Sequence, residues 1–344
     1  MNAHTINDLH MMQSVPTYIK VRMTQNRIRE WVYHYGIDTV YVSFSGGKDS
    51  TVLLHIAREL FPDIKAVFFN TGLEYPEIIK FVKTFDNVDI IRPKKSFKQV
   101  IDQYGYPFIS KEVSNKVYGA RKYLKKLKDT NSDKIPVPIR YKQVTGQVAR
   151  NRYDVSKYKF FLEAPFEISD ACCRIMKKNP AHNYTHETGR MPITAQMANE
   201  SSLRTQRWLI TGCNGFNMTS PISNPMSFWT EQDVLKYIKD NDIRICSVYG
   251  KIIEIDSKTV PVNDVDIQEL FDRHDTMLAT TGCKRTGCMF CGYGCHLEKT
   301  GQGRFLRLKE SHPKIYDYIM SPDGLNYKAV IDWINEHGNF HIEY

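Results

Sequence analysis

The chain has 344 residues and a formal net charge of +9, from 47 lysines and arginines against 38 aspartates and glutamates. Its hydrophobic fraction of 42% is enough to build a core, which excludes intrinsic disorder over most of the length. No apolar run reaches the roughly 18 residues of a membrane-spanning helix and the start does not resemble a secretion signal, so we expect a cytoplasmic protein with no membrane partner.

Strands alternate with helices in the first third of the chain. A helix is expected at 21–35, and strands at 39–44, 65–69 and 88–91 are each followed by a helix, at 51–60, 77–85 and 97–104. Such alternation implies right-handed crossovers, so the predicted fold class is α/β with a doubly wound parallel sheet. Later strands are expected at 192–196 and 208–211, and later helices at 230–240 and around 312–320.

The positive charge is concentrated in one stretch, an insertion at about 111–160. From Lys111 to Lys159 there are 14 lysines and arginines and four acidic residues, whereas the rest of the chain holds 33 and 34. Five tyrosines are interleaved with them, a pattern that suits a phosphate backbone with unstacked bases. The other interpretation is a solvated, lysine-rich helix. The predicted nucleic-acid contacts are Lys122, Lys125, Lys126 and Lys128.

The segment Ser45 to Ser50, SGGKDS, lies between an expected strand and an expected helix. Its two glycines let the backbone approach a ligand, and amides at a helix N-terminus bind anions. The hydroxyls and the Lys48 ammonium add donors for phosphate oxygens. The segment is not a Walker loop, because Val42 and Asp49 stand where that pattern needs Gly and Ser or Thr. We predict a phosphate-binding loop, with an ordinary turn as the alternative.

The cysteines fall into two groups. Cys283, Cys288, Cys291 and Cys295 lie within thirteen residues, and Cys172 and Cys173 are adjacent. Eight cysteines in a chain of this length do not indicate a disulfide scaffold, and thiolate ligation of a metal explains their density best. The four tail cysteines alone would be enough for a cluster or for zinc, and spacing does not choose between these arrangements.

The loop resembles the signature SGGxDS of the PP-loop family of adenine-nucleotide enzymes. Asn70 to Glu77 resembles the loop after the second strand of phosphoadenylylsulfate (PAPS) and adenylylsulfate (APS) reductases. The segment from Cys172 to Pro180 resembles their paired-cysteine element, and Glu200-Ser201 with Arg204 their arginine-bearing loop. Asn224 to Val234 resembles a helix start in the same enzymes. The matches cover about 39–238 and then the CxxC at Cys288 and Cys291.

This resemblance implies a particular site and a particular set of cofactors. The implied metal ligands are Cys172, Cys173, Cys288 and Cys291 for a 4Fe-4S cluster, with Cys283 and Cys295 as alternates and zinc as the alternative metal. Mg²⁺ would be held by Asp49 or by the phosphates of the nucleotide. The implied nucleotide contacts are Ser45, Gly46, Gly47, Lys48, Asp49, Ser50, Thr71, Gly72, Glu74 and Arg207, with Lys48, Asp49 and Arg204 as catalytic residues. The expected segments are 1–38 (helical), 39–245 (nucleotide-binding) and 246–344 (cysteine-rich and helical).

Two departures from the reductases favour ATP as the substrate. Those enzymes carry a nucleophilic cysteine near the C-terminus, and this sequence has none after Cys295. The loop is also intact, as in family members that hydrolyse ATP between its α and β phosphates. The expected activity is α-phosphate chemistry with pyrophosphate release in sulfur transfer, with tRNA or DNA as candidate acceptor and a sulfur donor or reductant protein as partner. The alternatives are a sulfonucleotide reductase that releases sulfite, and a non-catalytic nucleotide- or nucleic-acid-binding module.

Overall fold

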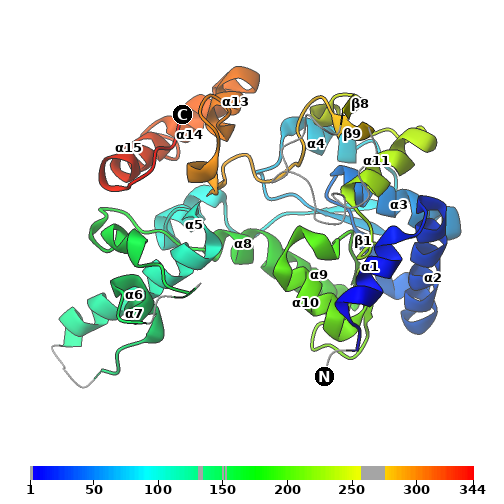
Figure 1. Ribbon diagram of the computed structural model, residues 1–344, viewed down its shortest axis with the longest axis horizontal. Coiled ribbons are helices and arrows are strands. Elements are labelled where there is room, and N and C mark those ends of the chain that lie inside the picture. Colours follow the sequence, from blue (N-terminus) through cyan, green and yellow to red (C-terminus); the bar gives the residue numbers. More distant parts are fainter. Residues whose placement is uncertain (1–2, 131–134, 149–150, 152, 257–275) are drawn as a thin grey trace. The chain divides into compact units, whose positions relative to one another are not determined.

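The computed structural model describes residues 3–130, 135–148, 151, 153–256 and 276–344. The chain divides into two compact units, each assembled from separated stretches of sequence (Figure 1). The first unit comprises Met1–Asn70, Glu74–Arg92 and Pro180–Thr286, and the second comprises Thr71–Leu73, Pro93–Asn179 and Gly287–Tyr344.

The first unit is built on a six-stranded sheet. The strands are β1 (Val40–Ser43), β2 (Ala66–Phe69), β3 (Val88–Ile91), β5 (Met191–Ile193), β6 (Asn214–Gly215) and β7 (Ile222–Ser223), in the order β3-β2-β1-β5-β7-β6. All neighbours pair in parallel except β6, which is antiparallel to β7. The strand order reverses at β1, which creates the switch point at which such sheets bind ligands. The predicted α/β fold with a doubly wound, mostly parallel sheet is confirmed.

Helices pack around this sheet and bury its apolar side chains. They are α1 (Ile6–Ser14), α2 (Thr17–Tyr35), α3 (Lys48–Leu60), α4 (Pro76–Val82), α9 (Asn179–Thr188), α10 (Ser202–Thr211) and α11 (Glu231–Asp240). Trp31 of α2, Phe44 after β1 and Trp229 before α11 are fully buried in one core. The unit also contains an antiparallel hairpin of β8 (Ile252–Asp256) and β9 (Thr276–Thr280).

The prediction of a strand at 208–211 is wrong, because these residues form the last turn of α10. The apolar run WLI resembles a strand in sequence, yet Ser201 caps the helix by accepting a hydrogen bond from the Arg204 amide. Only one side of this helix is buried, since Trp208 is 3% exposed while Leu203 and Ile210 are 76% and 56% exposed. The other predicted elements are present within a few residues of their expected bounds.

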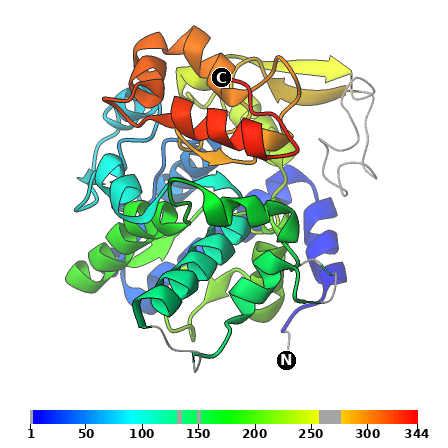
Figure 2. The ribbon, with the colours of Figure 1, turned by 90° about the vertical axis from the view of Figure 1, so that its left-hand side faces the viewer.

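The second unit is mainly helical. Its elements are α5 (Phe97–Tyr104), β4 (Phe108–Ile109), α6 (Lys111–Thr130), α7 (Ile139–Thr145), α8 (Ala171–Cys173), β10 (Gly292–Tyr293), α13 (Arg304–Ser311), α14 (Pro313–Met320) and α15 (Tyr327–His337). Figure 2 faces these helices, with α13 to α15 in orange and red. β4 and β10 pair in parallel, and Phe108, Phe305 and Tyr327 are fully buried beside them. None of the described helices in either unit is long and apolar enough to cross a membrane.

Candidate functional site

The predicted phosphate loop joins β1 to α3. Gly46 has a φ of 72°, and a Cβ there would lie 2.8 Å from the Val82 Cγ2 atom and 2.9 Å from that of Ile78, so the position requires glycine. Gly47 is the N-cap residue of α3 and has no side chain that could cap the first amides of the helix. The amides at the start of α3 are therefore the donors that an anion in the loop would use.

The two serine hydroxyls form hydrogen bonds within this loop. The Ser45 and Ser50 Oγ atoms lie 2.9 Å apart, and Ser50 Oγ also donates to the Gly47 carbonyl at 3.0 Å. The Ser45 amide donates to Ser50 Oγ at 3.1 Å. These bonds fix the loop conformation, and the role of both hydroxyls as phosphate donors stays a prediction.

Lys48 is buried at the start of α3 between two carboxylates. Its side chain is 2% exposed, and its Nζ lies 3.2 Å from Glu231 Oε1 and 3.6 Å from Asp49 Oδ1. Burial alone lowers the pKa of this ammonium, but the two carboxylates outweigh burial and leave the pKa above its ordinary value. Lys48 is therefore a fixed positive charge beside the loop.

The carboxylates of Asp49 and Glu231 place negative charge beside the loop as well. The Asp49 Oδ1 atom is buried and has no hydrogen-bond partner in the part of the chain that the structure describes. Burial raises the pKa of Asp49, and Glu231 raises it further, while Lys48 and Arg285 lower it. Sequence reasoning missed Glu231 and Arg285 as site residues, because only the folded chain brings the start of α11 and the segment after β9 to the loop.

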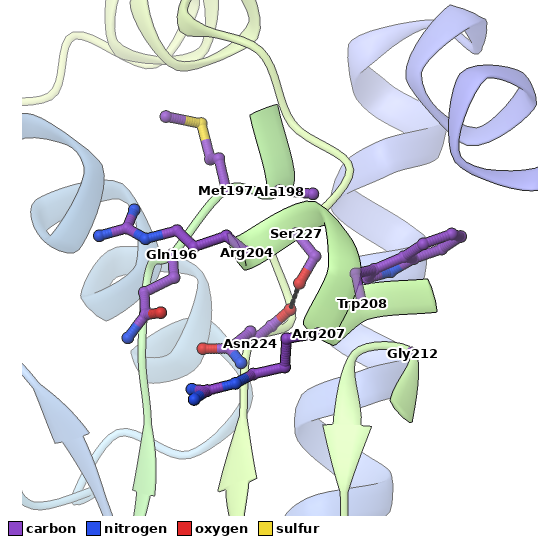
Figure 3. A pocket seen from close by; sticks show the side chains of 9 residues that line it. All are labelled: Gln196, Met197, Ala198, Arg204, Arg207, Trp208, Gly212, Asn224 and Ser227. Atoms are coloured by element: carbon purple, nitrogen blue, oxygen red, sulfur yellow. Dashed lines mark hydrogen bonds between the residues drawn. The ribbon is translucent and has the colours of Figure 1, made fainter. Parts of the chain in front are cut away.

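A pocket lies beside α10 (Figure 3). Figure 3 shows that Arg204 and Arg207 extend from one side of this helix, while Trp208 extends from the other. The remaining lining residues follow strands β5 and β7 or end α10, and they are Gln196, Met197, Ala198, Gly212, Asn224 and Ser227. Two guanidinium groups beside amide and hydroxyl side chains suit an anionic ligand.

The pocket and the phosphate loop share one edge of the sheet. The loop follows β1, the pocket residues follow β5 and β7, and these three strands are parallel. Arg204 forms an ion pair with Glu200 and lies within electrostatic reach of Asp49 and Arg285. Burial and the neighbouring arginines lower the pKa of Arg204. The structure therefore brings the predicted Arg204 and Arg207 to the same edge as the loop.

The predicted residues after β2 are divided between the units. Glu74, which is half-buried, belongs to the first unit, whereas Thr71 and Gly72 belong to the second. Thr71 is buried, and its hydroxyl accepts a hydrogen bond from the Leu73 amide at 3.2 Å. Gly72 has a φ of 75°, which favours glycine at this turn. Their part in nucleotide binding stays a prediction.

Four of the predicted metal ligands lie in the second unit. Cys172 is 8% exposed and directly precedes Cys173 in the chain. The Cys173 thiol raises the pKa of Cys172, the Cys172 thiol lowers the pKa of Cys173, and Cys288 and Cys291 lie within electrostatic reach of Cys172. The four cysteines that the family resemblance implies thus belong to one unit, and their role as metal ligands stays a prediction.

Local contacts explain how the CxxC segment reaches the paired cysteines. Gly292 is required because a Cβ there would lie 2.6 Å from the Phe108 ring, which closes the β4–β10 pairing. The Tyr293 hydroxyl donates to the Ser169 carbonyl at 3.0 Å, three residues before Cys172. These contacts join chain segments more than a hundred residues apart.

The two alternate cysteines have different surroundings. Cys283 belongs to the first unit, where its amide donates to the Val248 carbonyl at 2.8 Å. The Cys295 thiol, which is 3% exposed, donates to the Gly292 carbonyl at 2.8 Å. None of the eight cysteines, all within the described ranges, forms a disulfide. Among the residues that the structure describes, no three Cys, His, Asp or Glu side chains are gathered closely enough to hold a metal ion.

The predicted nucleic-acid residues form an exposed face of α6. Lys122, Lys125, Lys126 and Lys128 all point to solvent, and the Lys122 Nζ atom lies 4.6 Å from the centre of the Tyr118 ring. We call these four residues the α6 lysine face. Lys116 and Arg121, on the same helix, are instead tied to backbone carbonyls of the unit.

The chain is an α/β protein whose 45–50 loop lies at the switch point of a parallel sheet, the place at which such sheets bind ligands. Residues 39–145 and 131–293 match the family described as phosphoadenosine phosphosulfate reductase domain. These ranges span more than half of the chain, which therefore belongs to this family. The expected relationship to PAPS and APS reductases is confirmed.

Individual relatives match over shorter stretches. An uncharacterised protein of Methanocaldococcus jannaschii is 35% identical over 102 residues, which are 28% of this chain and 24% of that protein. A phosphoadenosine 5′-phosphosulfate reductase of Xylella fastidiosa is 27% identical over 90 residues, 25% of this chain and 38% of that protein. The chain thus matches well under half the length of these relatives. The crystal structure of PAPS reductase from Candida auris, in complex with phosphate, aligns with a TM-score of 0.37 and 14% identity over 65% of this chain and 82% of that one.

Proposed function

We propose that the protein is an enzyme that binds ATP with its phosphates on the 45–50 loop and acts at the α-phosphate. The observation that carries this proposal is the buried Lys48 ammonium beside the first amides of α3. A substrate oxygen would form a bond to the α-phosphorus as the bond to the bridging oxygen breaks and pyrophosphate leaves. Positive charge held next to the leaving group lowers the energy of that transition state.

The carboxylates at the loop favour a magnesium nucleotide over a nucleotide alone. Asp49 and Glu231 flank Lys48, and their charges would repel bare phosphates. A divalent cation between carboxylate and phosphate removes this repulsion, and Mg²⁺ takes oxygen ligands of both kinds. Asp49, with its buried and unsatisfied Oδ1, would hold Mg²⁺, which when bound would neutralise charge on the phosphates.

The cysteines of the second unit would hold an iron–sulfur cluster. The adjacent pair Cys172 and Cys173 shares this unit with the CxxC at Cys288 and Cys291, and thiols have the donor chemistry that such clusters use. The proposed ligands are Cys172, Cys173, Cys288 and Cys291. When bound, the cluster would supply electrostatic or redox support for sulfur transfer.

Sulfonucleotide reduction is the second candidate function. The pocket with Arg204 and Arg207 supports it, because the two guanidinium groups suit the 3′-phosphate that PAPS carries besides its phosphosulfate. Membership in the PAPS reductase domain family supports it equally. Both candidates use the same loop and differ in the bond that breaks.

Product analysis separates the two functions. Full-length protein purified without oxygen is incubated with ATP and Mg²⁺, and in parallel with APS or PAPS and a thiol reductant. We expect pyrophosphate from ATP, and release that increases when the sulfur acceptor is present. If the protein releases sulfite from APS or PAPS but no pyrophosphate from ATP, the first function is wrong and sulfonucleotide reduction is supported. If neither product forms and no nucleotide binds, both functions are wrong.

The acceptor in sulfur transfer is proposed to be a nucleic acid. The α6 lysine face supports this, since it presents four exposed ammonium groups within two turns of one helix. The stacking of Lys122 on Tyr118 shows that an aromatic ring lies beside this charge. A tRNA or single-stranded DNA would bind this face through its phosphates.

A further inference from the structure

A tyrosine hydroxyl accepts a hydrogen bond from a backbone amide of the 45–50 loop region that an anion in the loop would otherwise use. The backbone N–H of Lys48, the first residue of α3, donates to Tyr249 Oη at 3.1 Å. Tyr249 is 1% exposed, and its hydroxyl lies 2.7 Å from Thr286 Oγ1. A Cβ on Gly47 would lie 3.3 Å from the Tyr249 hydroxyl and 3.4 Å from that of Thr286. Both hydroxyls therefore lie directly over the loop.

The side chain of Lys48 is engaged by the same segment. Its Nζ donates to the Lys284 carbonyl at 3.2 Å and lies 5.7 Å from the centre of the Tyr249 ring. We call Tyr249, Lys284 and Thr286 the loop cap. The cap thus occupies both donors of Lys48, the amide and the ammonium, although the ammonium also keeps its two carboxylates.

The residues of the loop cap are held together as one piece. The Gly282 amide donates to the Tyr249 carbonyl at 2.9 Å, and the Cys283 amide donates to the Val248 carbonyl at 2.8 Å. Gly282 allows this approach, since a Cβ there would lie 2.3 Å from the Val248 carbonyl oxygen. These bonds continue the β8–β9 pairing up to the loop. Movement of Tyr249 away from the loop therefore involves the segment that ends at Thr286.

A phosphate oxygen and the Tyr249 hydroxyl compete for one donor. A backbone N–H makes one strong hydrogen bond, and a bond to a charged phosphate is stronger than a bond to a neutral hydroxyl. We propose that the loop cap is a displaceable lid that closes the phosphate loop in the absence of nucleotide, an inference that rests on the proposed nucleotide binding. The measured association constant for the nucleotide is then the intrinsic association constant multiplied by the fraction of molecules with the cap open.

The substitution Tyr249→Phe tests the lid, because it removes the competing acceptor and keeps the buried ring. Thr286→Val weakens the same contact without changing Tyr249. Tyr237→Phe is the matched control, since Tyr237 is 5% exposed and its hydroxyl contacts His55 instead of the loop. We expect Tyr249→Phe to bind ATP with Mg²⁺ about threefold to tenfold more tightly than the wild type, Thr286→Val to shift affinity in the same direction, and Tyr237→Phe to leave it unchanged.

Hydrogen exchange of the nucleotide-free protein gives an independent readout. We expect faster exchange in the peptide containing Gly46 to Asp49 in both cap variants, and unchanged exchange in Tyr237→Phe. Affinity that is equal or weaker in Tyr249→Phe and Thr286→Val, while the wild type binds ATP, would overturn the lid and leave the proposed function intact. If neither the wild type nor any variant binds ATP, APS or PAPS, the proposed function and the lid fail together.

Discussion

At the scale of single residues, the charge balance around Lys48 determines what the loop can bind. One buried ammonium faces two carboxylates, and Arg204 and Arg285 lie within electrostatic reach of Asp49. In the proposed function, a triphosphate would replace the carboxylates as the partner of the ammonium, provided that a cation compensates Asp49 and Glu231. The site therefore suits an anion that arrives together with a metal ion.

Replacement of Lys48 by methionine keeps the length of the side chain and removes its charge. We expect affinity for ATP with Mg²⁺ to fall at least about tenfold, because a charge-assisted contact to phosphate is lost. Isothermal titration calorimetry measures this change. Lys65→Met is the control, since Lys65 pairs with Asp89 at 3.1 Å and precedes β2, at the opposite end of the strands. Equal losses in the two variants would contradict a specific role for Lys48.

The sequence was sufficient to predict the turn that holds the candidate phosphate loop, because the whole signature lies in six consecutive residues between a strand and a helix. It was not sufficient to find Glu231, Tyr249 or Thr286, which lie about 180 to 240 positions from Lys48 and contact the loop region only in the fold. No local pattern marks these side chains as part of a site. Residues of this kind become visible only when strand order and packing are known.

At the scale of elements, a buried ion pair joins α2 to α11. Lys20 Nζ lies 2.6 Å from Asp233 Oδ2, and the two side chains are 3% and 9% exposed. Asp233 also accepts hydrogen bonds from Thr230 and Thr17, so it caps α11 as well as pairing with α2. Since Glu231 is the first residue of α11, this pair helps to position a carboxylate next to Lys48.

Substitution Lys20→Met is expected to lower the free energy of unfolding by about 3 kcal/mol, because it leaves the buried Asp233 charge without its partner. The matched control is Lys236→Met on α11, where Lys236 and Asp240 pair at 3.0 Å with side chains 57% and 51% exposed. Loss of that exposed pair is expected to cost less than about 1 kcal/mol. Urea unfolding followed by circular dichroism measures both values. A similar cost for the two substitutions would show that burial does not strengthen the Lys20 pair.

The α6 lysine face gives the second prediction at this scale. Substitution of its four lysines by glutamine is expected to weaken binding of a tRNA or a single-stranded DNA at least tenfold at about 100 mM salt. The slope of log affinity against log salt is expected to fall by about 3, since about 0.7 counterions are released per contact with a single strand. Fluorescence anisotropy over a salt series measures both quantities, and ATP affinity is expected to stay unchanged.

A second quadruple variant controls for net charge. It carries the same substitution at four other exposed lysines, which are Lys94, Lys236, Lys309 and Lys314. This variant loses the same total charge as the α6 variant, so any difference between them reports the position of the charge. If both variants lose affinity equally, the α6 lysine face is an ordinary solvated surface.

At the scale of the whole molecule, the fold class was predictable and the division into units was not. Alternation of strands and helices from residue 39 to residue 104 indicates a parallel sheet, and the chain order of these elements is local information. The two units interleave along the sequence, with the last passage from the first to the second between Thr286 and Gly287. No composition change marks that boundary, which lies inside the cysteine-rich segment, one residue before Cys288.

This interleaving brings cysteines from distant stretches of the chain into one unit. Cys172 and Cys173 share the second unit with Cys288 and Cys291, while Cys283 belongs to the first. We expect about four irons and four sulfides per chain after purification without oxygen, measured by iron and sulfide assays. Replacing any one of the four proposed ligands by serine is expected to remove most of both.

The matched control for these substitutions is Cys295→Ser. The Cys295 thiol donates to the Gly292 carbonyl at 2.8 Å, and a serine hydroxyl can donate there too, so we expect iron to be retained. Cys283→Ser is also expected to retain iron, because Cys283 belongs to the first unit and is not one of the four proposed ligands. Iron lost in Cys295→Ser and Cys283→Ser but kept in Cys172→Ser would place the metal on the tail cysteines alone. If the wild type contains one zinc ion and no iron, the cluster is wrong and the site is a structural zinc site, because four thiolates can bind either a cluster or zinc.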